Sequence, residues 1–155
     1  MKSILLKSKS LFACGLLVMG LGGIAVAHAE EYKDSGKTTC YTFKNDKMLK
    51  KASCTYKATG EYTGNAGGID VVFKMQGVQK STKVGLSWYF GGLDYELNGK
   101  EGTQVLRQKS NLKKATKAQQ DKAFNTGQGM SEFVVCVKEK NGNEFCYADG
   151  GIGTV

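Results

Sequence analysis

Two cysteines near the end of the chain lie symmetrically around an Asn-Gly pair, and their spacing restricts the fold more than any other feature of the sequence. Lys140-Asn141-Gly142 suits a three-residue hairpin loop, in which a type I turn ends in a left-handed glycine. That loop places Cys136 opposite Cys146 on neighbouring strands, at a spacing that a disulfide can span. The same register joins apolar or oppositely charged residues in three further pairs: Val135 with Tyr147, Val137 with Phe145 and Lys138 with Glu144. We therefore predict a disulfide-stapled hairpin, with the apolar pairs on the core face and the disulfide on the other face.

The first 29 residues have the pattern of a secretory signal peptide. Three lysines precede an apolar run over residues 11–27, and Ala27-His28-Ala29 fits an A-x-A cleavage site. We expect cleavage before Glu30 and export to the periplasm or the outside of a bacterial cell. A lipidation motif that ends at Cys14 is the alternative interpretation, although Phe12 fits that motif poorly.

Cleavage changes the composition of the chain. Loss of the three leading lysines lowers Lys plus Arg from 22 to 19 against 14 Asp plus Glu, so the net charge falls from +8 to +5. The only histidine, His28, leaves with the signal peptide. The remaining 126 of the 155 residues suit one domain, since domains commonly hold about 100–150 residues. We predict a single disulfide-stabilised β-rich domain over residues 30–155.

Four cysteines remain in the predicted mature chain, and an even number in an exported protein indicates two disulfides. With Cys136 paired to Cys146, the second disulfide joins Cys40 to Cys54 across a polar turn at Asn45-Asp46-Lys47. There is no C-x-x-C motif and no histidine to complete a zinc site. We therefore expect structural disulfides, no metal and no cofactor.

The rest of the predicted mature chain contains mostly strand-like segments, the clearest at residues 69–75, 86–90, 93–97 and 103–108. One segment differs: Ser110 can cap a helix near residues 111–125, and Gly127 can end it. We predict a mainly β fold, an antiparallel small barrel or sandwich of seven to eight strands with one helix. An outer-membrane barrel is the alternative, disfavoured because the expected strands are short and two carry lysine clusters.

The absence of histidine and of a free cysteine excludes Ser-His-Asp triads, Cys-His pairs and histidine-based metal sites from the predicted mature chain. Carboxylate chemistry remains, because two carboxyl groups about 5 to 9.5 Å apart can hydrolyse glycosides. Candidate carboxylates lie in or beside predicted strands at Asp70, Asp94, Glu96 and Glu101. Asp94 and Glu96 share one strand face by alternation. We expect a non-enzymatic protein and keep a carboxylate-based glycan hydrolase as the alternative.

The excess of lysine favours an anionic partner. Lys113, Lys114 and Lys117 form the first candidate patch, and Lys50 and Lys51 the second. The expected partners are an envelope glycan, an anionic lipid or an acidic protein. Nucleic acid is disfavoured because no aromatic residues alternate with these lysines to stack on bases.

Trp88, Tyr89 and Phe90 form the densest aromatic cluster, beside Gly91-Gly92. Alternation sends Tyr89 to the face opposite Trp88 and Phe90. If one of those faces is uncovered, the cluster is a candidate apolar contact for a partner; packing in the core is the alternative.

Small size, predicted export and two stapled hairpins together resemble, in general style, the periplasmic lysozyme inhibitors. The resemblance implies a binding function in the envelope, although a basic chain repels basic lysozymes, and no residue role is carried over. The predicted function is an exported, non-enzymatic binding or envelope-associated protein that recognises an anionic or protein partner. A glycan hydrolase and a structural or adhesive subunit are the alternatives.

Overall fold

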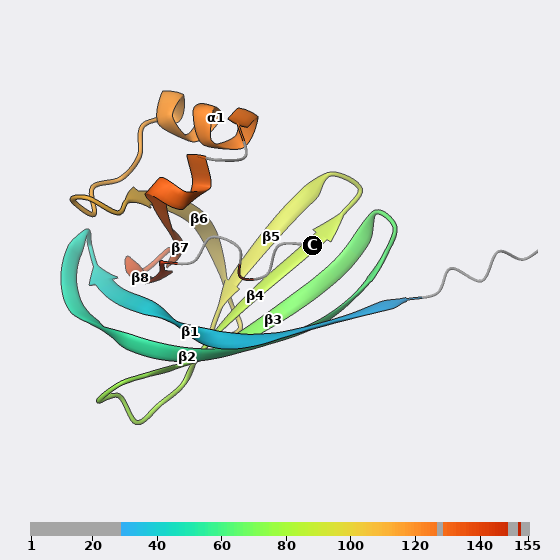
Figure 1. Ribbon diagram of the computed structural model, residues 1–155, viewed down its shortest axis with the longest axis horizontal. Coiled ribbons are helices and arrows are strands. Elements are labelled where there is room, and N and C mark those ends of the chain that lie inside the picture. Colours follow the sequence, from blue (N-terminus) through green and yellow to red (C-terminus); the bar gives the residue numbers. More distant parts are fainter. Residues whose placement is uncertain (1–28, 127–128, 149–151, 153–155) are drawn as a thin grey trace, which may run out of the picture.

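The computed structural model describes residues 29–126, 129–148 and 152, and it shows a closed antiparallel barrel (Figure 1). Each strand pairs with the next along the chain, and the last strand pairs with the first. The strands are β1 (Glu30–Lys44), β2 (Lys47–Thr63), β3 (Ala66–Met75), β4 (Thr82–Tyr89), β5 (Gly92–Leu97), β6 (Lys100–Gln108), β7 (Phe133–Glu139) and β8 (Asn143–Tyr147). The predicted mainly β fold is confirmed, as a barrel of eight strands rather than a sandwich.

Two helices, α1 (Lys117–Thr126) and the 3-10 helix η1 (Gly129–Glu132), connect β6 to β7. Among the described residues, no helix combines the length and the apolar character that crossing a membrane would require. The predicted signal peptide, apart from Ala29, and the predicted helix cap at Gly127 lie outside the described residues.

The hairpin of β7 and β8 has the register that its turn predicts. Gly142 has a φ of 88°, and its N–H donates to the Glu139 carbonyl over 3.0 Å. Cys136 and Cys146 are directly opposite and form a disulfide. The other predicted pairs are also present: Val135 with Tyr147, Val137 with Phe145 and Lys138 with Glu144.

The hairpin of β1 and β2 carries the second predicted disulfide, Cys40–Cys54. Its turn is the two-residue Asn45-Asp46, with φ values of 50° and 66°, as in a type I′ turn. A register irregularity follows Thr42, and Cys40 lies opposite Ala52 instead of Cys54. The disulfide therefore crosses the strands diagonally, with the two Cα atoms 5.9 Å apart.

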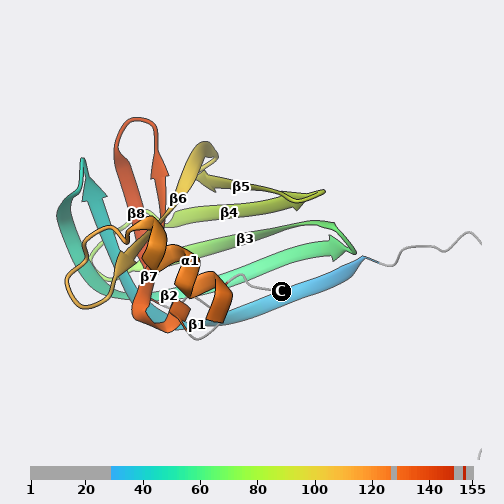
Figure 2. The ribbon, with the colours of Figure 1, turned by 90° about the horizontal axis from the view of Figure 1, so that it is seen from above.

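β1 and β2 are longer than the sequence indicates, at 15 and 17 residues, so the expectation of short strands is wrong for these two. β1 pairs with β8 only over Cys40–Lys44, and β5 pairs with β6 only over Tyr95–Leu97. A curved sheet of β1 to β5 therefore extends beyond the closed part of the barrel (Figures 1 and 2). We call this side the extended end: it holds the start of β1, the β2–β3 turn and the β4–β5 turn.

The barrel interior packs around Phe73. Its ring lies 5.0 Å from Tyr147, 5.1 Å from Phe145 and 6.2 Å from Tyr56, measured between ring centroids. Inward residues alternate with outward ones along each strand, as a half-buried strand requires. These buried aromatic rings hold β2, β3 and β8 together across the interior, because large rings dominate the burial of apolar area.

A second, smaller apolar cluster lies on the outer face, around the Cys136–Cys146 disulfide. Both cysteines are fully buried, among Tyr41, Phe43 and Val134. Leu112, from the segment between β6 and α1, packs against this cluster. The outer face of the β7–β8 hairpin, which the sequence analysis places opposite the core, is therefore buried as well.

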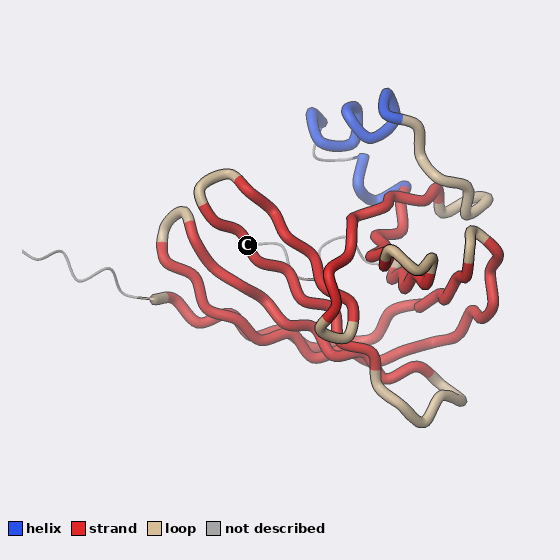
Figure 3. The backbone as a smooth tube through the Cα atoms, turned by 180° about the vertical axis from the view of Figure 1, so that it is seen from behind, coloured by secondary structure: helices blue, strands red, loops and turns tan. Residues whose placement is uncertain are grey.

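The predicted helix near residues 111–125 is present but starts at Lys117, and Ser110 is not its cap. Thr116 and Gln119 form a capping box: the Gln119 N–H donates to Thr116 Oγ1 over 3.4 Å, and the Thr116 N–H donates to Gln119 Oε1 over 2.8 Å. Residues 109–116 run irregularly beside β6, where the Ala115 N–H bonds to the Leu106 carbonyl. Figure 3 shows both helices gathered above one rim of the barrel.

Candidate functional site

The most connected polar group of the described residues is Arg107, on the outer face of β6. Its side chain is 3% exposed. Nε and Nη2 donate to the two carboxylate oxygens of Glu144 over 2.6 and 2.8 Å, and Nη2 also donates to Asp46 over 2.7 Å. Nη1 donates to the Leu112 carbonyl over 2.9 Å, and the guanidinium lies 4.2 Å from the ring of Phe43. Arg107 thus joins β6, β8, the β1–β2 turn and the segment before α1.

Asp46 is the exposed side of this network and attracts three cations. Besides Arg107, it contacts Lys114 at 2.8 Å and Lys138 at 3.8 Å. Hydrogen bonds from Lys114 and Arg107 lower the pKa of Asp46 from 3.8 to about 2. The bond to Asp46 in turn raises the pKa of Lys114. The network is saturated with internal contacts, so we assign it to the fold.

Replacing Asp46 by asparagine removes this charge and keeps a residue that tolerates a left-handed turn. Because the pKa of Asp46 is lowered to about 2 in the folded protein, the stabilisation is present above the unfolded pKa. It is lost as the pH falls from about 4 to about 2. The carboxylate is half exposed, so we expect Asp46→Asn to lower the free energy of unfolding by about 1 kcal/mol at neutral pH.

Urea unfolding of both proteins between about pH 7 and pH 2 measures this effect. The difference in the free energy of unfolding between wild type and Asp46→Asn should disappear at the lowest pH. Asp121→Asn, on the exposed surface of α1, is the control and should change little. A difference that persists unchanged at pH 2 would contradict the role given to the Asp46 carboxylate.

The lysines that the sequence singles out are not brought together into one patch. Lys114 pairs with Asp46, and neither it nor Lys113 lies in the helix. Lys117 is the first residue of α1. Lys50 donates to the Gly77 carbonyl over 2.9 Å, and Lys51 lies over the ring of Tyr41 at 5.6 Å.

A different set of lysines lies together on the outer face of β1 to β3. Lys37 and Lys74 lie on either side of Thr55 in the same cross-strand row. Lys57 lies two residues further along β2, on the same face. All three are exposed, and in the described part of the chain none forms an ion pair. We call Lys37, Lys57 and Lys74 the lysine face.

Sequence reasoning missed the lysine face because none of the strands that it marks most clearly includes Lys37 or Lys57. Once β1 is extended back to Lys37 and β2 forward to Lys57, period-two alternation alone turns both side chains outward. The position of Lys74 beside them depends on the register between β2 and β3, which the sequence does not show.

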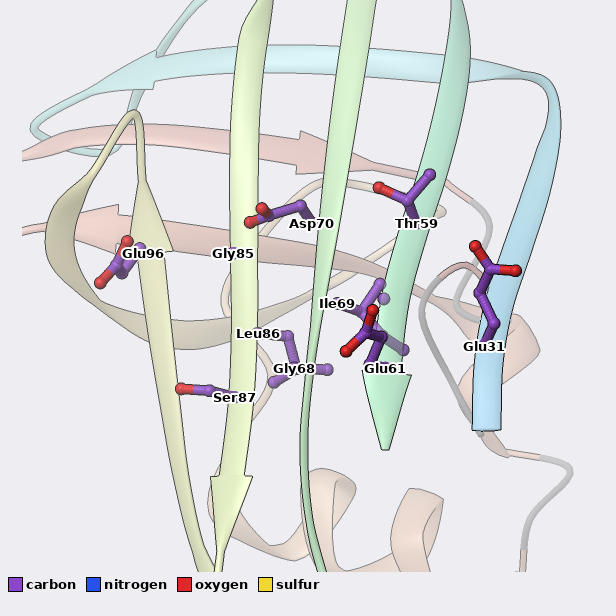
Figure 4. Close-up of a pocket in the computed structure, with 11 residues that line it drawn as sticks. Glu31, Thr59, Glu61, Gly68, Ile69, Asp70, Gly85, Leu86, Ser87 and Glu96 are labelled. Atoms are coloured by element: carbon purple, nitrogen blue, oxygen red, sulfur yellow. The ribbon is translucent and has the colours of Figure 1, made fainter. Parts of the chain in front are cut away.

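The outer face of β1 to β5 at the extended end has the opposite charge. A groove of about 520 Å³ lies there, bordered by the carboxylates of Glu31, Glu61, Asp70 and Glu96 (Figure 4). Gly68 and Gly85 form its floor, and the absence of their side chains leaves the space open. Two of the candidate carboxylates from the sequence, Asp70 and Glu96, therefore border one groove.

Asp70 and Glu96 face each other across Gly85. A Cβ atom on Gly85 would lie 3.4 Å from Asp70 Oδ1 and 3.7 Å from Glu96 Oε2, so these oxygens are no further apart than the sum of the two distances. Lys83 pairs with Asp70 over 2.7 Å. Of the other candidates, Asp94 lies opposite Ser87, whereas Glu101 pairs with Lys140.

In the β4–β5 hairpin, Trp88 and Tyr89 lie on opposite faces of the sheet, as alternation predicts. Trp88 is partly buried against the core. Tyr89 is 68% exposed and Phe90 76% exposed, in edge contact with ring centroids 4.4 Å apart. Phe90 lies in the turn, so it does not share the inner face with Trp88. Leu93, 51% exposed, lies opposite Trp88 and so is on the face away from Tyr89.

Cys136, Glu144 and Cys146 bring three potential metal ligands within 4.8 Å of one another. Both sulfur atoms are bonded to each other, and the Glu144 carboxylate is bonded to Arg107. In the disulfide-bonded protein, this group therefore offers no free ligand set, since zinc binds the deprotonated thiolate.

No protein-family model, no curated protein and no solved structure matches this chain.

Proposed function

We propose that the protein is an exported, non-enzymatic binding protein of the bacterial envelope, which recognises an anionic partner through the lysine face. The observation that carries this proposal is the arrangement of Lys37, Lys57 and Lys74 around Thr55, exposed and without a carboxylate partner in the described residues. Lys114, in contrast, is occupied by Asp46.

The partner class follows from the shape and charge of this surface. Three ammonium groups on a rigid sheet attract phosphate or carboxylate groups as point charges and do not require a shaped pocket. The partner we propose is an envelope glycan or lipid that carries repeated anionic groups. Two buried disulfides suit the oxidising compartment in which such a partner is met.

The test compares two triple variants of the disulfide-intact mature protein that have the same net charge. Lys37→Gln/Lys57→Gln/Lys74→Gln removes the lysine face. Lys113→Gln/Lys117→Gln/Lys122→Gln removes three exposed lysines in and just before α1. Binding to inorganic polyphosphate and to vesicles of anionic phospholipid is measured at two salt concentrations.

The first triple variant should bind at least about tenfold more weakly than wild type, since each lysine near an anionic surface contributes about 1 kcal/mol. The second triple variant should bind like wild type, and added salt should weaken the binding of both of these proteins. Equal losses of binding in the two triple variants would show that binding depends only on the net charge of the protein. Equal binding by all three proteins would remove the lysine face from the account.

A second candidate function is glycan hydrolysis, favoured by the placement of Asp70 and Glu96 across Gly85. Two carboxyl groups on opposite sides of a groove can act as acid and base or as acid and nucleophile. This candidate predicts cleavage of peptidoglycan or another polysaccharide that is abolished by Asp70→Asn or Glu96→Gln. Asp94→Asn, outside the pair, is the matched control. If the wild-type protein cleaves none of a broad panel of glycans, the hydrolase function is dismissed.

A further inference from the structure

The tip of the β4–β5 hairpin exposes more apolar surface than its place in the fold requires. Phe90 and Tyr89 are the two most exposed large apolar residues of the described chain, with 76% and 68% of their surface accessible, and their rings are in edge contact. Phe90 also lines a hollow of about 550 Å³, together with Trp88 and the β2–β3 turn. Contiguous exposed apolar groups of this kind are typical of contact sites for a partner.

The backbone conformation at Phe90 is one that a bulky residue disfavours, so the needs of the turn do not explain why phenylalanine is present there. Phe90 and Gly91 have φ values of 45° and 86°, the left-handed pair for which Asn-Gly is strongly preferred. The protein uses that preferred pair in its next turn, where Asn98 and Gly99 have φ values of 54° and 77°. A bulky residue with positive φ is an outlier, and such outliers gather at functional sites.

The charges beside the tip select the kind of partner. Glu61 lies opposite Gly68, and Asp94 lies opposite Ser87, so both carboxylates are on the outer face next to the aromatic tip. In the described part of the chain neither forms an ion pair. The two nearby outer-face lysines are already engaged, Lys33 with Glu31 and Lys83 with Asp70. An anionic membrane would be repelled by this rim, whereas a cationic surface is attracted to it.

We propose that the aromatic tip, Tyr89 and Phe90, is a docking surface for a basic segment of another protein. The aromatic side chains form the apolar anchor, and Glu61 and Asp94 pair with lysine or arginine residues at its edge. This arrangement follows the anatomy of protein interfaces, in which a few buried aromatic residues dominate and charged groups at the rim set partner choice. The surface is separate from the lysine face and does not depend on it.

Phe90→Asn creates the preferred Asn-Gly pair in this turn and removes the aromatic anchor. It therefore distinguishes a role of Phe90 in binding from a role in folding. Leu49→Asn is the control: Leu49 is 63% exposed and lies at the start of β2, beside the β1–β2 turn. Figure 1 shows this turn at the end of the molecule away from the β4–β5 turn. The probes are fluorescein-labelled extended peptides that alternate lysine with leucine or phenylalanine, and a matched set with glutamate in place of lysine. Binding to the full mature protein is measured by fluorescence anisotropy.

Wild type and Leu49→Asn should bind the lysine peptides and not the glutamate peptides. Phe90→Asn should bind at least about tenfold more weakly, as expected for loss of an aromatic hot spot, while its melting temperature stays the same or rises. Glu61→Gln/Asp94→Asn should also weaken binding and reduce its salt dependence.

Three results would overturn the proposal. The first is equal binding of the lysine peptides by Phe90→Asn and wild type, or no binding by either. The second is insertion of the tip into lipid vesicles that depends on Phe90. The third is self-association of wild type, measured by sedimentation, that Phe90→Asn abolishes, because the occupant would then be a second copy of this chain.

Discussion

Arg107→Met should lower the free energy of unfolding by about 3 to 5 kcal/mol, because it leaves the Glu144 carboxylate buried without its partner. The Glu144 side chain has no exposed surface, and both of its oxygens accept hydrogen bonds from Arg107. A loss of this size is a large fraction of the stability of an ordinary domain. Urea unfolding of the purified protein measures it.

A double variant distinguishes an unpaired charge from simple loss of packing. Arg107→Met/Glu144→Leu removes both charges and should recover much of the stability, since buried ion pairs can often be replaced by apolar residues of similar size. Arg107→Lys should lie between wild type and Arg107→Met, because a single ammonium cannot form the two-pronged contact with a carboxylate. A loss below about 1 kcal/mol for Arg107→Met, or a double variant less stable than the single one, would contradict the structure of this network.

Cys136→Ala/Cys146→Ala should cost about 3 kcal/mol or more. Roughly 3 kcal/mol is expected from freeing the unfolded chain across a short loop. The two sulfur atoms are also fully buried beside Tyr41 and Phe43, so their removal leaves a space in the outer apolar cluster. A cavity in a packed region adds to the loss.

Thermal unfolding of this variant is compared with that of Cys40→Ala/Cys54→Ala and of wild type, with and without reductant. Intact mass before and after reduction should show a gain of four hydrogens in wild type and of two in each double variant. Reductant should lower the melting temperature of wild type more than that of either variant. A wild-type melting temperature that is insensitive to full reduction would contradict the stabilising role of the disulfides.

The sequence predicts the last hairpin down to its residue pairs, because the signals for its register are local. Asn141-Gly142 sets the turn, and the cysteines, charges and apolar residues on either side agree with it. In the first hairpin, the register irregularity after Thr42 changes the pairing, and no residue type marks it. The disulfide Cys40–Cys54 is still predicted correctly, because counting the remaining cysteines is enough.

The start of the helix illustrates a local signal that was present and not used. Thr116-Lys117-Ala118-Gln119 is a capping box, which competes with Ser110 for the helix start and prevails in the structure. Moving the start to Lys117 releases Lys113 and Lys114 from the helix. The candidate patch of Lys113, Lys114 and Lys117 is therefore split between a loop and α1.

Other features could not be predicted, since they depend on contacts between distant parts of the chain. Arg107 contacts Asp46 and Glu144, which lie 61 and 37 residues away in sequence. Asp70 and Glu96 come together only because β3, β4 and β5 pair in one particular register across Gly85. Alternation gives the face on which each residue lies, but not its neighbour on the next strand.

The distribution of charge gives the barrel two distinct surfaces. Carboxylates gather at the extended end, around the groove and the aromatic tip, whereas Lys37, Lys57 and Lys74 lie further along the outer face of β1 to β3. A net charge of +5 for the predicted mature chain conceals this division. Each surface can therefore select a partner of opposite sign.

The most direct test of the proposed function is to map where an anion binds. The predicted mature chain, labelled with nitrogen-15, is titrated with inorganic polyphosphate, and the backbone amide shifts are followed by nuclear magnetic resonance. We predict saturable shifts centred on Thr55 and on the three lysines around it, which salt suppresses. Shifts centred on residues 109–122, or no saturable shift, would contradict the lysine face as the binding site.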